Sequence, residues 1–116
     1  MTEWTLELTE SAEQELKALP ADFQARFLHI AELLESLGPS RVREPHVKHL
    51  EGKLWEIRLR GKDGIARAIY FTKVGKRLCV VRIFVKKTQK TPRSEIEMAL
   101  KRMAEEKHDG ENAHEP

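Results

Sequence analysis

The stretch that decides the fold is residues 54–93, LWEIRLRGKDGIARAIYFTKVGKRLCVVRIFVKKTQKTPR. Apolar residues alternate with polar ones in three runs, which is the pattern of β-strands buried on at least one face. Short glycine-containing segments at 61–64 and 74–76 separate the runs and predict tight hairpin turns. The sequence therefore predicts three consecutive antiparallel strands, at about 54–60, 65–72 and 77–87.

Positive charge is concentrated in the same stretch. Residues 54–93 contain twelve lysines and arginines but only two acids, whereas the whole chain has a net charge of +2. A basic segment in a nearly neutral protein indicates a local anion-binding surface. If Arg58, Arg67 and Arg82 point to one face, they form a cross-strand row that can bind phosphate groups bidentately.

The residues before the sheet predict a strand and two helices. Residues 3–8 alternate as a strand, and Thr9 or Ser11 can cap a helix that ends near Leu19. A second helix is predicted over 21–37, because apolar residues recur there at helical spacing and Gly38 and a proline follow as a stop signal. Its apolar stripe consists of Phe23, Phe27, Ile30, Ala31, Leu34 and Leu37.

The predicted fold class is α+β, with the element order β-α-α-β-β-β-α. A helical hairpin is expected to pack on one face of a small, mostly antiparallel sheet, with the arginines on an open opposite face. Residues 47–50 in the connector could form a short strand or a turn. Thr91 predicts an N-cap for a last helix over about 92–107. Residues 1–107 are expected to form one domain and the polar residues 108–116 a disordered tail.

The bulk sequence also restricts the cellular setting. The single cysteine, Cys79, excludes an internal disulfide and lies in an apolar run that predicts a buried thiol. The N-terminal residues are too acidic and polar for a targeting peptide, and no apolar run approaches the roughly 20 residues of a membrane span. We expect a cytoplasmic protein that does not contact membranes.

Several classes of active site are absent from the sequence. There is no HExxH, CxxC, P-loop or GxGxxG motif and no carboxylate cluster for Mg²⁺, so we expect no metal and no cofactor. RNA cleavage without a metal requires deprotonation of a 2′-hydroxyl, stabilisation of the phosphorane and protonation of the leaving oxygen. Crowded cations stabilise the phosphorane and can lower the pKa of a neighbouring lysine. Glu56 is interpreted as an ion-pair partner of a neighbouring arginine, and the functional alternative is a carboxylate that orients an arginine or takes a proton.

Three features together resemble a known family. These are LWEIRLR at 54–60, Arg67 four residues before a phenylalanine, and RIFVKKTQKTPRSEIEMA at 82–99. They closely resemble the RelE/ParE toxin superfamily, and FVKKTQKTPRSEI at 84–96 resembles its HigB-like, phage-derived branch. The resemblance covers roughly residues 3–107 and implies a RelE-like fold. It also implies the toxin of a type II toxin–antitoxin system. RelE- and HigB-like members cut mRNA at the ribosome, ParE-like members inhibit DNA gyrase, and the usual partner in this branch is a small helix-turn-helix antitoxin.

The resemblance also implies roles for particular residues. Arg58 and Arg67 match strand arginines that face RNA, and Lys86 and Lys87 lie where the last strand carries functional residues. Lys48 and Lys53 lie in the basic connector where RelE-like members carry lysines that contact RNA. Many nuclease members have a tyrosine or histidine near the end of the last strand, where this chain has Phe84 and Lys86, so the general acid or base stays unassigned.

The leading hypothesis is a metal-independent endoribonuclease that cuts mRNA on the ribosome and so inhibits translation. The alternatives are a ParE-like gyrase inhibitor and a non-catalytic basic module that binds nucleic acid or protein. The expected catalytic residues are Arg58, Arg67, Arg82, Lys86 and Lys87, and the expected RNA-binding residues are Lys48, His49, Lys53 and Arg60.

Overall fold

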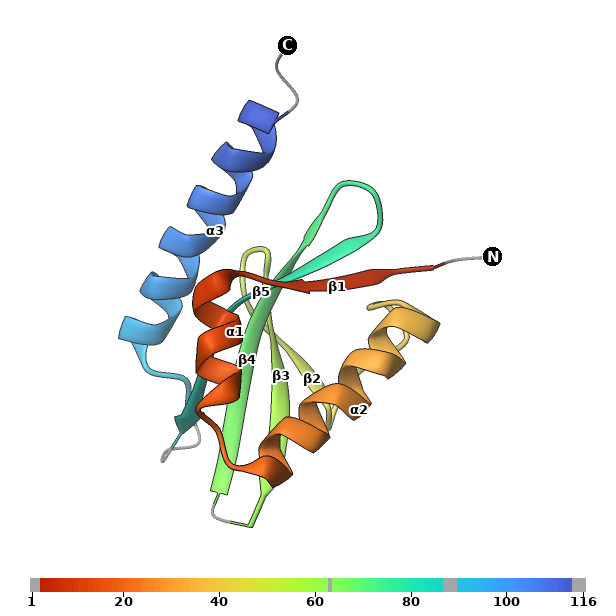
Figure 1. Ribbon diagram of the computed structural model, residues 1–116, viewed down its shortest axis with the longest axis vertical. Helices are drawn as coiled ribbons and strands as arrows, with labels where there is room; N and C mark the ends of the chain where they lie inside the picture. The colour runs from red at the N-terminus through yellow and green to blue at the C-terminus, as the bar shows by residue number, and fades with distance from the viewer. Residues whose placement is uncertain (1–2, 63, 87–89, 114–116) are drawn as a thin grey trace.

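The computed structural model describes residues 3–62, 64–86 and 90–113, with side chains up to residue 106. The chain is α+β (Figure 1), and the predicted order of elements is confirmed, with one further strand in the connector. The elements are β1 (Thr5–Leu8), α1 (Glu10–Lys17), α2 (Ala21–Leu37), β2 (Val47–Glu51), β3 (Leu54–Gly61), β4 (Gly64–Lys73), β5 (Arg77–Lys86) and α3 (Arg93–Ala113).

The strands form one five-stranded sheet in the order β1-β5-β4-β3-β2. Strands β2 to β5 pair antiparallel with their neighbours, whereas β1 runs parallel to β5. The predicted mostly antiparallel sheet is therefore confirmed. The connector segment that the sequence left open between strand and turn forms the edge strand β2, whose register on β3 shifts between His49 and Glu51.

The first two helices follow their sequence signals. The side chain of Thr9 caps α1 by accepting a hydrogen bond from the backbone N–H of Ala12 at 3.1 Å. Helix α2 has the predicted bounds, and its apolar stripe is buried except at Leu37, which is 45% exposed. The helix ends at Leu37 and is capped by Gly38, whose φ of +85° favours glycine and whose N–H donates to the Leu34 carbonyl at 2.9 Å.

Helices α1 and α2 cover the same face of the sheet, α1 over β5 and α2 over β3 (Figure 1). Each fully buried large side chain in this layer contributes about 1.5–3 kcal/mol relative to an exposed one. This layer is the larger of the two cores. Its largest buried members are Tyr70, Phe23, Phe27, Ile30, Leu34, Ile57 and Leu59.

The sequence predicts that the opposite face of the sheet is open. This prediction is wrong for part of the face, because α3 packs across it (Figure 1). Strands β4 and β5 are buried along most of their length on both faces, so they need a second apolar layer. Helix α3 supplies that layer, and it continues to Ala113, beyond the predicted end near Lys107, because no proline interrupts it. The second core consists of Leu54, Ile69, Phe71, Cys79, Val81, Phe84, Ile96 and Ala99. No helix among the described residues is long and apolar enough to cross a membrane.

A β-bulge in β5 decides which side chains face α3. The pairing of β4 with β5 shifts between Ile69 and Tyr70, which leaves Val81 as the extra residue. Strict alternation predicts that the apolar residues 79, 81, 83 and 85 share one face. In the structure, Cys79 and Val81 pack in the core under α3, whereas Ile83 packs in the core under α1 and α2. The side chains after the bulge are thereby exchanged between the two faces.

Candidate active site

The arginines that were predicted to form one cross-strand row do not all share it. Arg58 of β3 pairs directly with Arg67 of β4, and Arg67 pairs with Phe84 of β5. Arg82 lies two residues earlier on β5, opposite Ile69. The row therefore continues through Phe84 and not through Arg82. The physical reason for this correction is the register of β5 on β4, which places Arg82 two positions away from the residue opposite Arg67.

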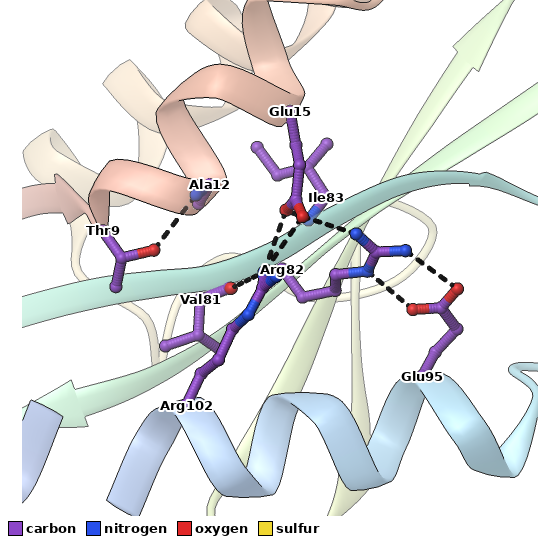
Figure 2. Close-up of polar contacts among 8 residues, drawn as sticks. All are labelled: Thr9, Ala12, Glu15, Val81, Arg82, Ile83, Glu95 and Arg102. Atoms are coloured by element: carbon purple, nitrogen blue, oxygen red, sulfur yellow. Dashed lines mark hydrogen bonds and ion pairs between the residues drawn. The ribbon is translucent and has the colours of Figure 1, made fainter. Parts of the chain in front are cut away.

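Acids on α1 and α3 bind the guanidinium of Arg82 (Figure 2). Its guanidinium lies 2.5 Å from the Glu15 carboxylate and 2.6 Å from the Glu95 carboxylate. Glu15 also accepts hydrogen bonds from the backbone N–H of Ile83 and from Arg102, each at 3.0 Å. The network ties α1, β5 and α3 together, and we assign Arg82 to this structural role.

Arg58 and Arg67 line a cleft of about 740 Å³ between β2, β3 and the start of α3. A hollow of about 550 Å³ adjoins it and shares four of its cations, and Arg60 lines that hollow. We call the two together the basic cleft. Five predicted site residues line it, namely Lys48, His49, Arg58, Arg60 and Arg67, whereas Lys53, Arg82 and Lys86 do not.

Glu56 is the buried acid of the basic cleft and is only 1% exposed. Its carboxylate accepts hydrogen bonds from the Arg67 guanidinium and from the Thr91 hydroxyl. The Arg58 Nε lies 3.9 Å from the same carboxylate. The predicted pairing of Glu56 with a neighbouring arginine is confirmed. Glu56 therefore orients Arg67 through a hydrogen-bonded ion pair and attracts Arg58 by charge.

Lys86 lies next to this ion pair and is 6% exposed. Its Nζ is 3.4 Å from the hydroxyl oxygen of Thr91, a residue that lines the basic cleft. Burial, followed by repulsion from Arg67, lowers the pKa of the Lys86 ammonium from 10.5 to about 8. A lysine with such a pKa is present partly as the neutral amine near physiological pH and can transfer a proton there.

The sequence predicts that Thr91 caps α3, and this prediction is wrong. The carbonyl of Pro92 accepts the first helical hydrogen bond, so Pro92 takes the cap position and α3 begins at Arg93. The Thr91 hydroxyl instead donates to Glu56. Lys90, Thr91 and Arg93 all line the basic cleft, although sequence reasoning did not include them in the site. The available signal was their place directly after the last strand, where a helix that packs back on the sheet must start.

The remaining predicted residues relate differently to the basic cleft. The Nε2 of His49 lies 2.8 Å from the Gly52 carbonyl, and its ring packs edge-on against Trp55 with centroids 4.9 Å apart. Lys53 is exposed on the turn between β2 and β3. Lys87 lies outside the described residues. His49 is thus a fixed part of the cleft wall, while Lys53 lies away from it.

The other side chain that could be reactive is the thiol of Cys79. The residue is 1% exposed, and burial raises the pKa of its thiol to about 12. The prediction that this thiol is buried is confirmed, and its inertness stays a prediction. Among the residues that the structure describes, no three His, Cys, Asp or Glu side chains gather as metal ligands would.

Comparisons with known proteins agree with this geometry. The sequence model of the family described as "Phage derived protein Gp49-like (DUF891)" matches residues 14–104. Among curated proteins, none is similar enough to match the sequence.

Solved structures with a similar fold include two that contain RelE. One is the archaeal RelE–RelB complex from Pyrococcus horikoshii, with a TM-score of 0.56, 23% identity, and coverage of 74% of this chain and 98% of that chain. The other is a mutant of the E. coli toxin RelE in the free state, with a TM-score of 0.65, 17% identity, and coverage of 87% and 98%. The RelE-like fold implied by the strand motifs is therefore confirmed.

Proposed function

The chain belongs to the Gp49-like family of phage-derived proteins, and from this premise we propose that it is the toxin of a toxin–antitoxin pair that cuts mRNA on the ribosome. The RelE-like fold supports a toxin, because one similar structure is the toxin RelE and the other is a RelE–RelB complex. The observation that carries the proposal is a buried cluster in which Glu56, Arg67 and Thr91 line the basic cleft and Lys86 lies directly behind Thr91.

The rim of the basic cleft suits an RNA backbone. Lys48, Arg58, Arg60 and Lys90 line it from β2, β3 and the segment before α3. Cations placed in this way contact phosphate oxygens, which gives salt-dependent affinity but little reading of base sequence. The ribosome would then supply the ordered mRNA strand, and the toxin would supply the cutting site in the cytoplasm.

The buried cluster suits metal-independent cleavage of that strand. In its neutral form, Lys86 accepts the proton of the 2′-hydroxyl, and the 2′-oxygen attacks the adjacent phosphorus. Arg67 and Arg58 stabilise the negative charge of the phosphorane. The bond from phosphorus to the 5′-oxygen then breaks, and that oxygen takes a proton from water. The products are a 2′,3′-cyclic phosphate and a 5′-hydroxyl end.

The proposed partner is a cognate antitoxin of the small helix-turn-helix kind. We propose that this antitoxin covers the basic cleft when it binds. The RelE of the archaeal complex is bound to RelB, which supports an antitoxin partner for a chain of this fold. Acidic residues of an antitoxin would complement the cations of the cleft. Binding should therefore weaken as salt is raised, and it should compete with RNA.

The test is addition of the purified protein to a cell-free translation extract, followed by analysis of the mRNA. We expect cleavage of translated mRNA by the wild type and a loss of cleavage of at least about a hundredfold in Arg67→Lys, which keeps the charge but not the bidentate geometry. Lys17→Met, on the exposed surface of α1, is the matched control and should cleave normally.

Two further readouts separate the alternatives. A supercoiling assay with DNA gyrase is expected to show no inhibition, and inhibition with intact mRNA would replace the proposal by a gyrase inhibitor. Salt-dependent binding of RNA without cleavage on the ribosome would replace it by a binding module.

A further inference from the structure

We propose that Thr91 is a positioning residue for Lys86: its hydroxyl, held by Glu56, fixes the lysine amine beside the basic cleft. The inference rests on the proposed function, because it assigns how that site places its proton-transfer group. Thr91 is 8% exposed, Lys86 6% and Glu56 1%. They come from the segment before α3, the end of β5 and the middle of β3, so only the folded chain brings them together.

The hydrogen bonds among these side chains have one consistent direction. A carboxylate only accepts hydrogen bonds, so the Thr91 hydroxyl donates its single proton to Glu56. The lone pairs of the same oxygen then face Lys86 Nζ, which donates to it at 3.4 Å. Glu56 is itself held by Arg67. Lys86 is thereby anchored, through Thr91, to a carboxylate whose own position is fixed by an ion pair.

The local sequence also restricts the position of the hydroxyl. A residue that precedes proline is confined to extended conformations, because the α region brings it against the proline ring. Thr91 precedes Pro92 and is β-branched, which also restricts its χ1 angle. The long lysine side chain has many rotamers, so it gains most from an acceptor that cannot move.

A role limited to helix capping does not explain this arrangement. The cap position of α3 belongs to Pro92, and the Thr91 hydroxyl reaches across to β3, to a residue 35 positions away in the sequence. What Thr91 touches is the acid that orients the arginines on one side and the lysine on the other. Removal of the Thr91 hydroxyl should therefore change the position and the pKa of the Lys86 amine, and not only the stability of α3.

The first test compares cleavage rates and pH profiles of the full-length variants. Thr91→Val keeps the shape but removes the hydroxyl, and its maximal rate should fall by at least about tenfold, while Thr91→Ser should restore it to within about threefold. Loss of the acceptor disfavours the ammonium form, so the rise of the rate with pH should move to lower pH in Thr91→Val. Thr72→Val, at an exposed position of β4, is the matched control and should change neither quantity.

The second test measures the pKa of Lys86 by NMR titration of the labelled lysine side chains, and it does not depend on RNA cleavage. Thr91→Val should lower the pKa of Lys86, whereas Thr91→Ser and Thr72→Val should leave it unchanged. If the wild type does not cut RNA, the proposed function fails, but this titration still decides the role of Thr91. Thr91→Ala replaces Thr91→Val if the latter does not fold. An unchanged Lys86 pKa in the folded variant that lacks the hydroxyl would overturn the inference.

Discussion

Replacing Lys86 by methionine should stabilise the fold while it abolishes cleavage. Lys86 is 6% exposed, and burial followed by repulsion from Arg67 lowers its pKa from 10.5 to about 8. At about 1.4 kcal/mol for each pH unit, the buried ammonium destabilises the native state by about 3 kcal/mol near pH 7. Methionine has a similar length and no charge. The lost hydrogen bond to Thr91 offsets about 1 kcal/mol of this effect. The free energy of unfolding of Lys86→Met should therefore exceed that of the wild type by about 2 kcal/mol.

The gain should depend on pH in a defined direction. The pKa of Lys86 is lower in the folded protein than in the unfolded chain, so the unfolded chain binds more protons between about pH 8 and pH 10.5. The stability of the wild type therefore rises with pH across that window. The advantage of Lys86→Met is complete below about pH 8 and falls as the pH rises toward 10.5, where only the cost of the lost hydrogen bond, about 1 kcal/mol, is left.

Urea denaturation at several pH values from 6 to 10 measures this effect through the free energy of unfolding. Lys101→Met, at an exposed position of α3, is the matched control and should change stability by less than about 0.5 kcal/mol at every pH. A Lys86→Met variant that is less stable than the wild type near pH 7 would refute the reasoning. A gain that stays constant up to pH 10 would also refute it.

Three further predictions concern the scaffold. Arg82→Ala should lower the free energy of unfolding by about 2–4 kcal/mol, because Glu15 and Glu95 lose their shared cation. Its cleavage per folded molecule should stay within about threefold of wild type, and a loss of cleavage without a loss of stability would return Arg82 to the active site. Cys79, with its pKa raised to about 12 by burial, should react with a thiol reagent only on unfolding, and rapid labelling of the native protein would contradict that burial. Gly61→Ala should cost about 1–3 kcal/mol in a thermal melt, because the added Cβ would lie 2.5 Å from the Phe23 ring, and an unchanged melting temperature would contradict this packing.

Local signals in the sequence predicted the elements that they control. The α2 stripe, ended by Gly38, has a period that only a helix satisfies, and its predicted bounds match the structure. The hairpin turns of the sheet follow in the same way from glycines between alternating runs. Glu56 could be paired with an arginine from sequence because it is the one acid among several cations on its strand and the next.

Non-local contacts account for what the sequence did not predict. The bulge at Val81 leaves no local signal, and it determines that Phe84 and not Ile83 lies opposite Arg67. Thr91 before Pro92 has the pattern of a helix cap, but a buried carboxylate on β3 competes successfully for its hydroxyl. Both differences arise because tertiary packing decides among local alternatives of similar energy.

The most direct test of the central claim is the fate of mRNA on translating ribosomes with wild-type protein and with Lys86→Met, both confirmed as folded. We predict that the wild type cuts the message and leaves 5′-hydroxyl and 2′,3′-cyclic phosphate ends, while Lys86→Met leaves it intact. Intact mRNA with the wild type would contradict the proposed cutting activity, and cleavage by Lys86→Met at the wild-type rate would contradict the assignment of Lys86 as the proton acceptor.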